Sequence, residues 1–348
     1  MYMNLGKTPI IIIGAGVAGL TIAKTLKTED YIILEARDRV GGRILTNSNN
    51  LDDGAAWVHG LCENPLTKLL RSDDLISVAE CNPWMHSENV NITYLTKMNF
   101  IHDKDRHDKW NKLVNEISLT NSTTTIAEAF SFLSDDDDMR SFLYMIEVWC
   151  GGSIRDLPVS FLQQLDYKSA LFGDYAGSHC LFKNGAKTLI ESLSTCCKYN
   201  IICNQIVVKI VYNNVGTEVH TRDGIVYSCN KLCITIPPGP LRDIVFEPPM
   251  KPEKIEALSR IKMGSYKKIQ LEFDEPFWNN VPMILSRNEE NEYILWNNYM
   301  ISKNVPILEA ICPADNGWKM VGKSDEEIVE SVMDHLNLYF QNVPFPKA

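Results

Sequence analysis

The clearest hydrophobic pattern lies at the N-terminus, where a short apolar run precedes a helical repeat and a second apolar run. Residues 10–13 are four consecutive isoleucines, which is typical of a strand buried on both faces of a parallel sheet. Apolar side chains between Leu20 and Leu26 then recur at helical spacing. Residues 31–35 read as the next strand. The sequence therefore predicts a β–α–β unit at the start of the chain.

Two further patterns divide the rest of the chain. Residues 61–175 show helical patterns separated by polar connectors, with few glycines and little strand character, so we expect a largely helical insertion. Within it one predicted helix carries an apolar face formed by Trp110, Leu113, Val114 and Ile117. From about residue 200 onward, alternating and β-branched segments predict strands, with a turn at Asp223-Gly224. Two capping boxes, Thr125 with Glu128 and Ser324 with Glu327, predict helix starts.

Length and charge narrow the classes of protein. A chain of 348 residues is too long for one simple hydrophobic core, so we expect two interleaved domains. Together with the helical and strand patterns above, this predicts an α/β fold of mixed α+β character. The net charge of −10 argues against a nucleic-acid partner. The N-terminus has no signal-peptide pattern and no run reaches the length of a membrane span, so we expect a cytoplasmic protein without a membrane partner. The ten cysteines show no metal-binding spacing.

A glycine motif follows the first predicted strand. Gly14, Gly16 and Gly19 have the spacing G-x-G-x-x-G. In a β–α–β unit the first glycine makes a tight turn, the second lets the backbone approach a pyrophosphate, and the third allows close helix–sheet packing. Glu35 ends the next strand 21 residues after Gly14, where a carboxylate accepts hydrogen bonds from ribose hydroxyls and repels a 2′-phosphate. The alternative is a glycine-rich turn with a structural acid.

The segment "LEARDRVGGRILT" (34–46) resembles the flavin-containing amine oxidases, a family that includes polyamine oxidases, monoamine oxidases and flavin-dependent histone lysine demethylases. The resemblance implies FAD as the cofactor. It also implies that this segment lies along the FAD ribose and diphosphate, through Glu35, Ala36, Arg37, Gly42 and Arg43. Arginine is suited to pairing with diphosphate oxygens. Surface arginines are the simpler alternative for the two cations.

"LDDGAAWVHG" (51–60) resembles the segment of the same family that runs beneath the isoalloxazine ring. The resemblance implies that Gly54, Ala55, Ala56 and Trp57 contact the flavin. It also implies that His59 borders the amine channel, although a lone histidine is as often only a satisfied polar residue.

Two later segments extend the resemblance. "NQIVVKI" is similar to the adenine-side strand, which implies that the backbone of Val207 lies against the adenine. "MGSYKKIQLEFDEPFW" is similar to the segment whose lysine holds a water beside flavin N5, and this implies that role for Lys268. The alternation sets Lys268 opposite Ile269 and Leu271, whereas the competing Lys267 falls on the apolar side. A solvated strand face is the plain alternative for Lys268.

The resemblance implies a Rossmann-like FAD-binding domain interleaved with a mixed-sheet and helical substrate domain. We expect the FAD-binding domain at 1–62 and 196–245, and the substrate domain at 63–195, largely helical, and at 246–348. The family continues beyond "FPKA" into a segment that completes the flavin site. A chain truncated at its C-terminus, with that part missing, is therefore expected.

The resemblance implies oxidation of a polyamine-like amine to an imine, with hydride transfer to flavin N5 and formation of hydrogen peroxide. Its small-molecule partners are then an amine and oxygen. Two alternatives stay open. A truncated, catalytically inactive flavoprotein-like domain follows if the shortened site loses FAD. An amino-acid oxidase of the same superfamily needs a guanidinium to bind the substrate carboxylate, and the sequence does not place one.

Overall fold

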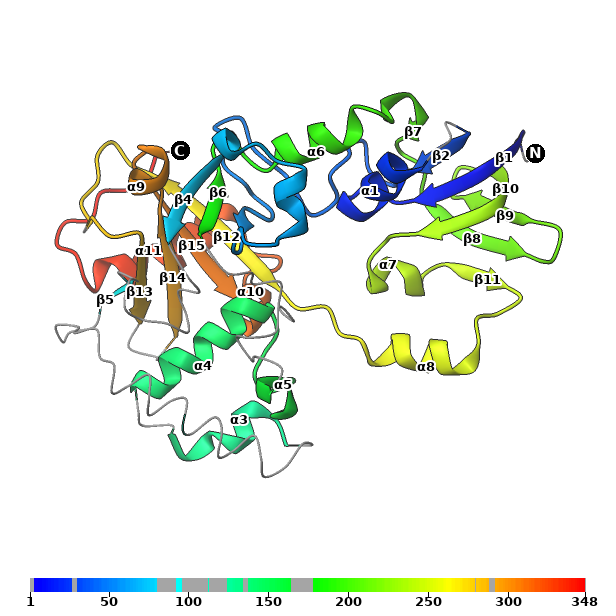
Figure 1. The fold of residues 1–348 in the computed structure, drawn as a ribbon. Coiled ribbons are helices and arrows are strands. Elements are labelled where there is room, and N and C mark those ends of the chain that lie inside the picture. Colours follow the sequence, from blue (N-terminus) through cyan, green and yellow to red (C-terminus); the bar gives the residue numbers. More distant parts are fainter. Residues whose placement is uncertain are drawn as a thin grey trace. The chain divides into compact units, whose positions relative to one another are not determined.

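The computed structural model describes residues 3–26, 30–79, 92–95, 112, 124–133, 137–163, 178–278, 280–287 and 292–347. They form two compact units, each assembled from segments distant in the sequence (Figure 1). The described residues of unit 1 fall within 1–56, 65–74 and 182–263, and those of unit 2 within 57–64, 75–181 and 264–348. Each unit is considered by itself below.

The described residues of unit 1 form a seven-stranded sheet with the order β11-β8-β9-β10-β1-β2-β7. β1 is parallel to β10 and β2, and β2 is parallel to β7, whereas β9 is antiparallel to β8 and β10. The strands are β1 (Met3–Ile13), β2 (Tyr31–Leu34), β7 (Ile201–Ile202), β8 (Val207–Tyr212), β9 (Thr217–Thr221), β10 (Ile225–Ile234) and β11 (Val245–Glu247). The helices are α1 (Val17–Thr25), α6 (Lys187–Ser194), α7 (Pro238–Arg242) and α8 (Pro252–Arg260), with short 3₁₀ turns at Pro65–Lys68, Ser72–Asp74 and Lys198–Asn200.

The isoleucine run lies at the centre of this sheet. Ile11 and Ile12 are fully buried, because β1 has strands on both sides and core side chains on its faces. Leu20 of α1 is also fully buried. The predicted β–α–β unit is therefore confirmed. Its parallel strands bring the carboxyl ends of β1, β2 and β10 to one edge of the sheet, which is where α/β folds bind ligands.

The part of unit 2 that the structure describes contains a five-stranded sheet with the order β12-β15-β14-β13-β5 and a three-stranded sheet with the order β3-β6-β4. The strands are β3 (Trp57–Val58), β4 (Leu75–Ala79), β5 (Ile92–Leu95), β6 (His179–Phe182), β12 (Tyr266–Glu272), β13 (Met283–Arg287), β14 (Tyr293–Asn298) and β15 (Ile307–Pro313). The helices are α3 (Ile126–Ala129), α4 (Asp137–Cys150), α5 (Ser160–Gln163), α9 (Tyr299–Lys303), α10 (Ala314–Lys319) and α11 (Asp325–Asn337), with a 3₁₀ turn at Ser131–Leu133.

The two faces of the five-stranded sheet pack against different helices. On one face Leu271 and Trp296 join a core with Val332 of α11. On the other face Leu295 packs in a cluster with Tyr144 of α4. Successive side chains of a strand point to opposite faces. Each residue of β12, β14 and β15 can therefore be assigned to one of these two faces.

The prediction of a largely helical segment over 63–195 stays a prediction, because only part of this segment is described. Its described residues include helices α3, α4, α5 and α6, and also the strands β4, β5 and β6, which the sequence did not predict. β5 pairs with β13, which lies about 190 residues later in the chain. A strand whose partner is so distant leaves little trace in the local pattern. The predicted apolar helical face from Trp110 to Ile117 lies outside the described residues.

Both capping boxes are confirmed. The Thr125 hydroxyl accepts from the Glu128 N–H at the start of α3, and the Ser324 hydroxyl accepts from the Glu327 N–H at the start of α11. Among the described residues no helix is long and apolar enough to cross a lipid bilayer.

The chain passes back and forth between the two compact units, as it does between the predicted domains, but the boundaries differ. Residues 57–62 lie in unit 2, and residues 65–74, 182–195 and 246–263 lie in unit 1. The assignment of one unit to FAD and the other to substrate stays a prediction.

Candidate active site

The glycine turn joins β1 to α1 in unit 1. Gly14 has φ of +103°, in the region that favours glycine, and its N–H donates to the Leu34 carbonyl at 2.8 Å. A Cβ at Gly19 would lie 1.9 Å from the Gly14 oxygen. Gly19 therefore lets the first turn of α1 pack directly on the turn that precedes it.

The second glycine faces a different neighbour. A Cβ at Gly16 would meet only the Gly42 Cα, at 3.9 Å, and Gly16 caps α1 without a side-chain hydrogen bond. Gly41 donates to the Ala15 carbonyl at 2.9 Å, so the 41–43 turn lies beside the start of α1. The open N–H groups of a first helical turn, flanked by glycine backbone, suit the approach of a phosphate group.

Glu35 is buried at the carboxyl end of β2, with only 7% of its surface exposed. Its Oε2 accepts from the Ala15 N–H at 2.7 Å and its Oε1 accepts from the Arg37 N–H at 3.0 Å. Each carboxylate oxygen has a further lone pair, so Glu35 can bind a hydroxyl while it holds the glycine turn and the 36–43 segment together.

Three arginines follow Glu35, and they have different tasks. Arg39 donates to the carbonyls of Gly42 and Ile44, at 3.2 Å each, and so shapes the turn. Sequence reasoning missed this role, although Arg39 lies between the other two cations. Arg37 and Arg43 are exposed, and Arg37 also donates to the Gly42 carbonyl at 3.2 Å.

Residues 51–56 lie against the end of the 34–46 segment and form backbone hydrogen bonds with it. The Ala55 N–H donates to the Arg43 carbonyl at 3.2 Å, and a Cβ at Gly54 would lie 2.1 Å from that oxygen. Gly54 is thus required by a close backbone approach. Ala55 and Ala56 continue from this contact, and only Ala56 is buried.

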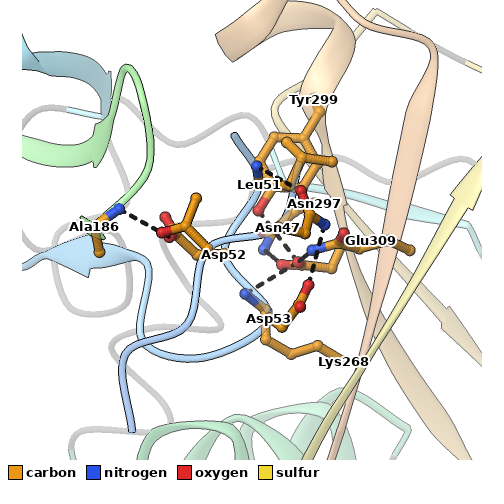
Figure 2. Close-up of polar contacts among 11 residues, drawn as sticks. Asn47, Leu51, Asp52, Asp53, Ala186, Lys268, Asn297, Tyr299 and Glu309 are labelled. Atoms are coloured by element: carbon orange, nitrogen blue, oxygen red, sulfur yellow. Dashed lines mark hydrogen bonds and ion pairs between the residues drawn. The ribbon is translucent and has the colours of Figure 1, made fainter. Parts of the chain in front are cut away.

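Asp52 anchors the start of α6 to this segment. Its buried carboxylate accepts from the Ala186 N–H at 2.8 Å (Figure 2). It also accepts from the Thr46 hydroxyl at 2.5 Å. A Cβ at Gly185 would lie 2.1 Å from Thr46 Cγ2. The single glycine of "KNGAK" therefore stands where the chain passes closest to Thr46.

The connection into β8 runs beside Glu35. The Gln205 N–H donates to the Glu35 carbonyl at 2.8 Å, and the Asn204 N–H donates to the Arg37 carbonyl at 2.9 Å. Val207 is buried at the start of β8 and pairs with Thr221. Sequence reasoning named Val207 but missed Asn204 and Gln205, the residues that join this connection to the end of β2.

These residues fit a dinucleotide. Around the carboxyl ends of β1 and β2 the structure brings together Gly14, Gly16, Gly19, Glu35, Arg37 and Gly42. The cluster offers an uncapped helix N-terminus, glycine backbone, a buried carboxylate and an exposed guanidinium. Such a set can bind a pyrophosphate and a ribose diol.

The remaining predicted site residues lie in unit 2. Trp57 and Val58 form β3, which is antiparallel to β6. His59 follows immediately, its ring stacked on Trp57 with centroids 6.1 Å apart and the planes at 19°. His59 Nδ1 lies 3.2 Å from His179 Nδ1. His179 was not expected from the sequence as a site residue.

Lys268 is in a buried ion pair. Its Nζ lies 3.0 Å from Glu309 Oε2, and the two side chains are only 8% and 0% exposed (Figure 2). The interpretation of Lys268 as a residue on a solvated strand face is therefore wrong. Lys267, the competing lysine, is exposed.

Glu309 also accepts from neutral groups on both sides. Gln270 Nε2 and Asn297 Nδ2 each donate to it at 2.9 Å, and the Tyr299 hydroxyl donates at 3.2 Å. The register explains the arrangement, because Gln270 and Asn297 lie directly opposite Glu309 on β12 and β14. Four donors compensate for the removal of this carboxylate from water.

The Lys268–Glu309 ion pair lies on the same face of the five-stranded sheet as the hydrophobic cluster against which Trp57 packs. Lys268 pairs in register with Ile311, and Trp57 packs against the cluster containing Ile311, Leu295 and Tyr144. Unit 2 thus places the tryptophan–histidine segment and the charged lysine on one side of one sheet. A site on this face combines an apolar aromatic wall with a few oriented polar groups, as small-molecule sites do.

The fold of unit 1, with its glycine turn and buried strand-end carboxylate, defines a dinucleotide-binding α/β protein. A family model described as "Flavin containing amine oxidoreductase" matches residues 17–348. The chain therefore belongs to this family, and it is a flavin-dependent oxidoreductase of the amine oxidase type. The family and the mixed α/β fold class predicted from the sequence are both confirmed.

Individual relatives agree with this assignment. The chain is similar to polyamine oxidase 4 of Oryza sativa subsp. japonica, with 29% identity over 94% of this chain and 72% of the relative. It is 25% identical to lysine-specific histone demethylase 1 homolog 3 of Arabidopsis thaliana, over 97% of this chain and 25% of the relative. A structure of putrescine oxidase bound to putrescine shares the fold, with a TM-score of 0.72 and 18% identity over 98% of this chain and 83% of that one.

Proposed function

We propose that this chain binds FAD and oxidises a polyamine-like amine to an imine, with formation of hydrogen peroxide. The observation that carries the proposal is the cluster at the carboxyl ends of β1 and β2. There the buried Glu35 and the glycine turn meet the 36–43 segment. The names polyamine oxidase and putrescine oxidase among the similar proteins support the substrate class.

In this proposal the FAD site uses residues of four segments. Gly14, Gly16 and Gly19 admit the pyrophosphate, Glu35 binds the ribose, and Arg37 and Arg43 neutralise diphosphate charge. The backbone of Val207 lies against the adenine. The full set assigned to FAD is Gly14, Gly16, Gly19, Glu35, Ala36, Arg37, Gly42, Arg43, Gly54, Ala55, Ala56, Trp57 and Val207.

Bound FAD would supply the redox chemistry, since it accepts a hydride from the amine carbon at N5 and its electrons then reduce oxygen to hydrogen peroxide. The chain itself orients the amine, excludes water and holds polar groups in place. We assign to Lys268 the task of holding a water at the reacting flavin edge, and to His59 a place beside the amine. The ion pair with Glu309 keeps Lys268 in a defined position.

The first test is the visible spectrum of the purified chain after incubation with FAD and removal of the excess. We expect a flavin spectrum that is bleached by spermine or spermidine without oxygen and restored by air, with peroxide released. A colourless protein that takes up no FAD would contradict the proposal and favour an inactive flavoprotein-like domain. A yellow protein that no amine bleaches would contradict the amine substrate alone.

A second test concerns Lys268. Lys268→Met removes the ammonium group, and we expect flavin binding to persist while kcat falls about 10- to 100-fold, in the range of single acid–base or water-positioning groups. Lys267→Met is the matched control on the same strand, because Lys267 is exposed. Equal effects of the two substitutions would contradict the assignment.

A further inference from the structure

A pair of histidines in unit 2 follows from the strand register. β3 and β6 are antiparallel, with Trp57 opposite Leu181 and Val58 opposite Cys180. The next pair in this register is His59 opposite His179. The two Nδ1 atoms lie 3.2 Å apart, and the ring centroids are 5.4 Å apart with the planes at 71°. The rings therefore meet edge to edge through one nitrogen each.

A single proton must lie between the two Nδ1 atoms. Two protonated nitrogens at this distance repel each other, and two unprotonated nitrogens leave no hydrogen bond. His179 is 1% exposed. Burial, with a smaller contribution from His59, lowers the pKa of His179 to about 4. At neutral pH His179 is thus a neutral imidazole with one ring proton.

The environment of His179 decides which of its nitrogens carries that proton. Its Nε2 is buried and has no hydrogen-bond partner among the described residues. A proton on Nε2 would create an unpaired buried N–H, which proteins avoid more strongly than an unpaired acceptor. A proton on Nδ1 is instead donated to His59. His59 then accepts at Nδ1, so its own proton is on Nε2.

We propose that His179 is a positioning residue that donates from Nδ1 to His59 Nδ1 and holds His59 in the tautomer protonated on Nε2. The stacking of Trp57 on His59 fixes the same ring from its face. At Nε2 His59 can then donate a hydrogen bond, and while His179 donates to its Nδ1 neither ring nitrogen of His59 is available to take up a proton.

The proposal has a consequence for the substrate, and this consequence rests on the proposed amine oxidation. A histidine that only donates cannot deprotonate an ammonium group. It can donate to the lone pair of an amine that is already neutral. His59 therefore selects the neutral form of the amine, and it does not act as the base that generates this form.

Nitrogen NMR on the chain labelled with ¹⁵N-histidine tests the tautomers without amine or FAD. The chain has seven histidines, and the signals of His59 and His179 are assigned by single substitutions. At pH 7.5 we expect His59 to show a bare Nδ1 and a protonated Nε2, and His179 to show the reverse. A protonated Nδ1 on His59, or equal averaging of its two nitrogens, would overturn the proposal.

Two substitutions separate positioning from packing. His179→Phe keeps a ring but removes the donor, so we expect the His59 signals to move toward a tautomer mixture. His179→Asn retains an amide donor near the place of Nδ1, and we expect it to preserve the wild-type His59 pattern. A His59 pattern that His179→Phe leaves unchanged would overturn the proposal. If His179→Phe does not fold, the wild-type and His179→Asn spectra still decide.

The outcome is independent of catalysis. A wild-type spectrum with the expected tautomers in a chain that oxidises no amine would keep the histidine pair and reject the proposed function. Where amine oxidation is found, His179→Phe should change the pH profile of kcat/KM and His179→Asn should restore it. An altered profile in neither variant would contradict the role of the pair toward the amine.

Discussion

At the residue scale, the glycines of the opening motif differ in how much room each has for a side chain. Gly19 is required by packing, because a Cβ there would meet the Gly14 oxygen. Gly16 has room for a methyl group and an ordinary φ of −79°. Spacing alone cannot make this distinction, since it depends on which atoms the fold brings to each Cα.

This difference predicts that substitutions at the two glycines affect different properties, stability at Gly19 and FAD binding at Gly16. Gly19→Ala should lower the free energy of unfolding by several kcal/mol, since large effects come from strain against fixed backbone (about 3 kcal/mol or more). Gly16→Ala should leave it within about 1 kcal/mol, while its methyl group hinders the approach of the pyrophosphate.

Urea unfolding and FAD titration of both variants check this prediction. Gly239→Ala is the matched control, because a Cβ there meets only Met263 Cγ at 3.9 Å. Unimpaired FAD binding by a folded Gly16→Ala variant would show that no phosphate passes at this position.

At the element scale, β12 carries two ion pairs of different character. Lys268 with Glu309 is buried, whereas Lys347 with Glu272, at 3.2 Å, has side chains that are 45% and 41% exposed. The alternation of β12 predicted the polar face correctly. It could not predict burial, because that depends on β15 lying beside β12, on β14 lying beyond β15, and on the side chains of both strands.

The two pairs therefore predict different coupling energies. Removing one partner of a buried pair costs about 3–5 kcal/mol, because it leaves an uncompensated buried charge. We expect Lys268→Met and Glu309→Gln each to destabilise the chain strongly, and the double variant to cost less than their sum.

A double-mutant cycle by urea unfolding measures this coupling. The cycle of Lys347→Met with Glu272→Gln is the control on the same strand, with an expected coupling of about 0–1 kcal/mol. Equal coupling in the two cycles would mean that burial adds nothing to the interaction of Lys268 with Glu309.

At the scale of the whole molecule, buried titratable groups give opposite pH dependences of stability. Burial raises the pKa of Glu147 from 4.5 to about 7, with a further contribution from Asp315. Its stabilising contribution is present below pH 4.5 and is lost as the pH rises through about 7. Burial lowers the pKa values of His179 and His335 from 6.5 to about 4. Their contribution is present above pH 6.5 and is lost as the pH falls toward 4.

Glu147→Gln isolates one of these terms. We expect the free energy of unfolding at pH 8 to rise by up to about 3 kcal/mol, since one pKa unit corresponds to about 1.4 kcal/mol, and to be unchanged at pH 4.5. Urea unfolding at both pH values measures the effect, with the exposed Glu330→Gln as control. A parallel shift at both pH values would contradict the assignment of the raised pKa to Glu147.

The amino-acid sequence was sufficient to predict the β–α–β opening, the capping boxes, the family and the residues of the glycine turn. Each of these depends on side chains close in the sequence or on a motif that stands as a continuous string. It did not determine the strands β4 and β5 or the units to which residues 57–62 and 246–263 belong, because strand pairing and packing join distant segments.

The partners of the proposed site residues, in contrast, depend on how distant strands pair. Glu309 reaches Lys268, and His179 reaches His59, through the registers of β15 with β12 and of β6 with β3. Lysine and histidine in a strand pattern are equally compatible with water and with a buried partner. The register brings His179 opposite His59 and sets Glu309 diagonally from Lys268, and neither partner can be read from the local sequence around Lys268 or His59.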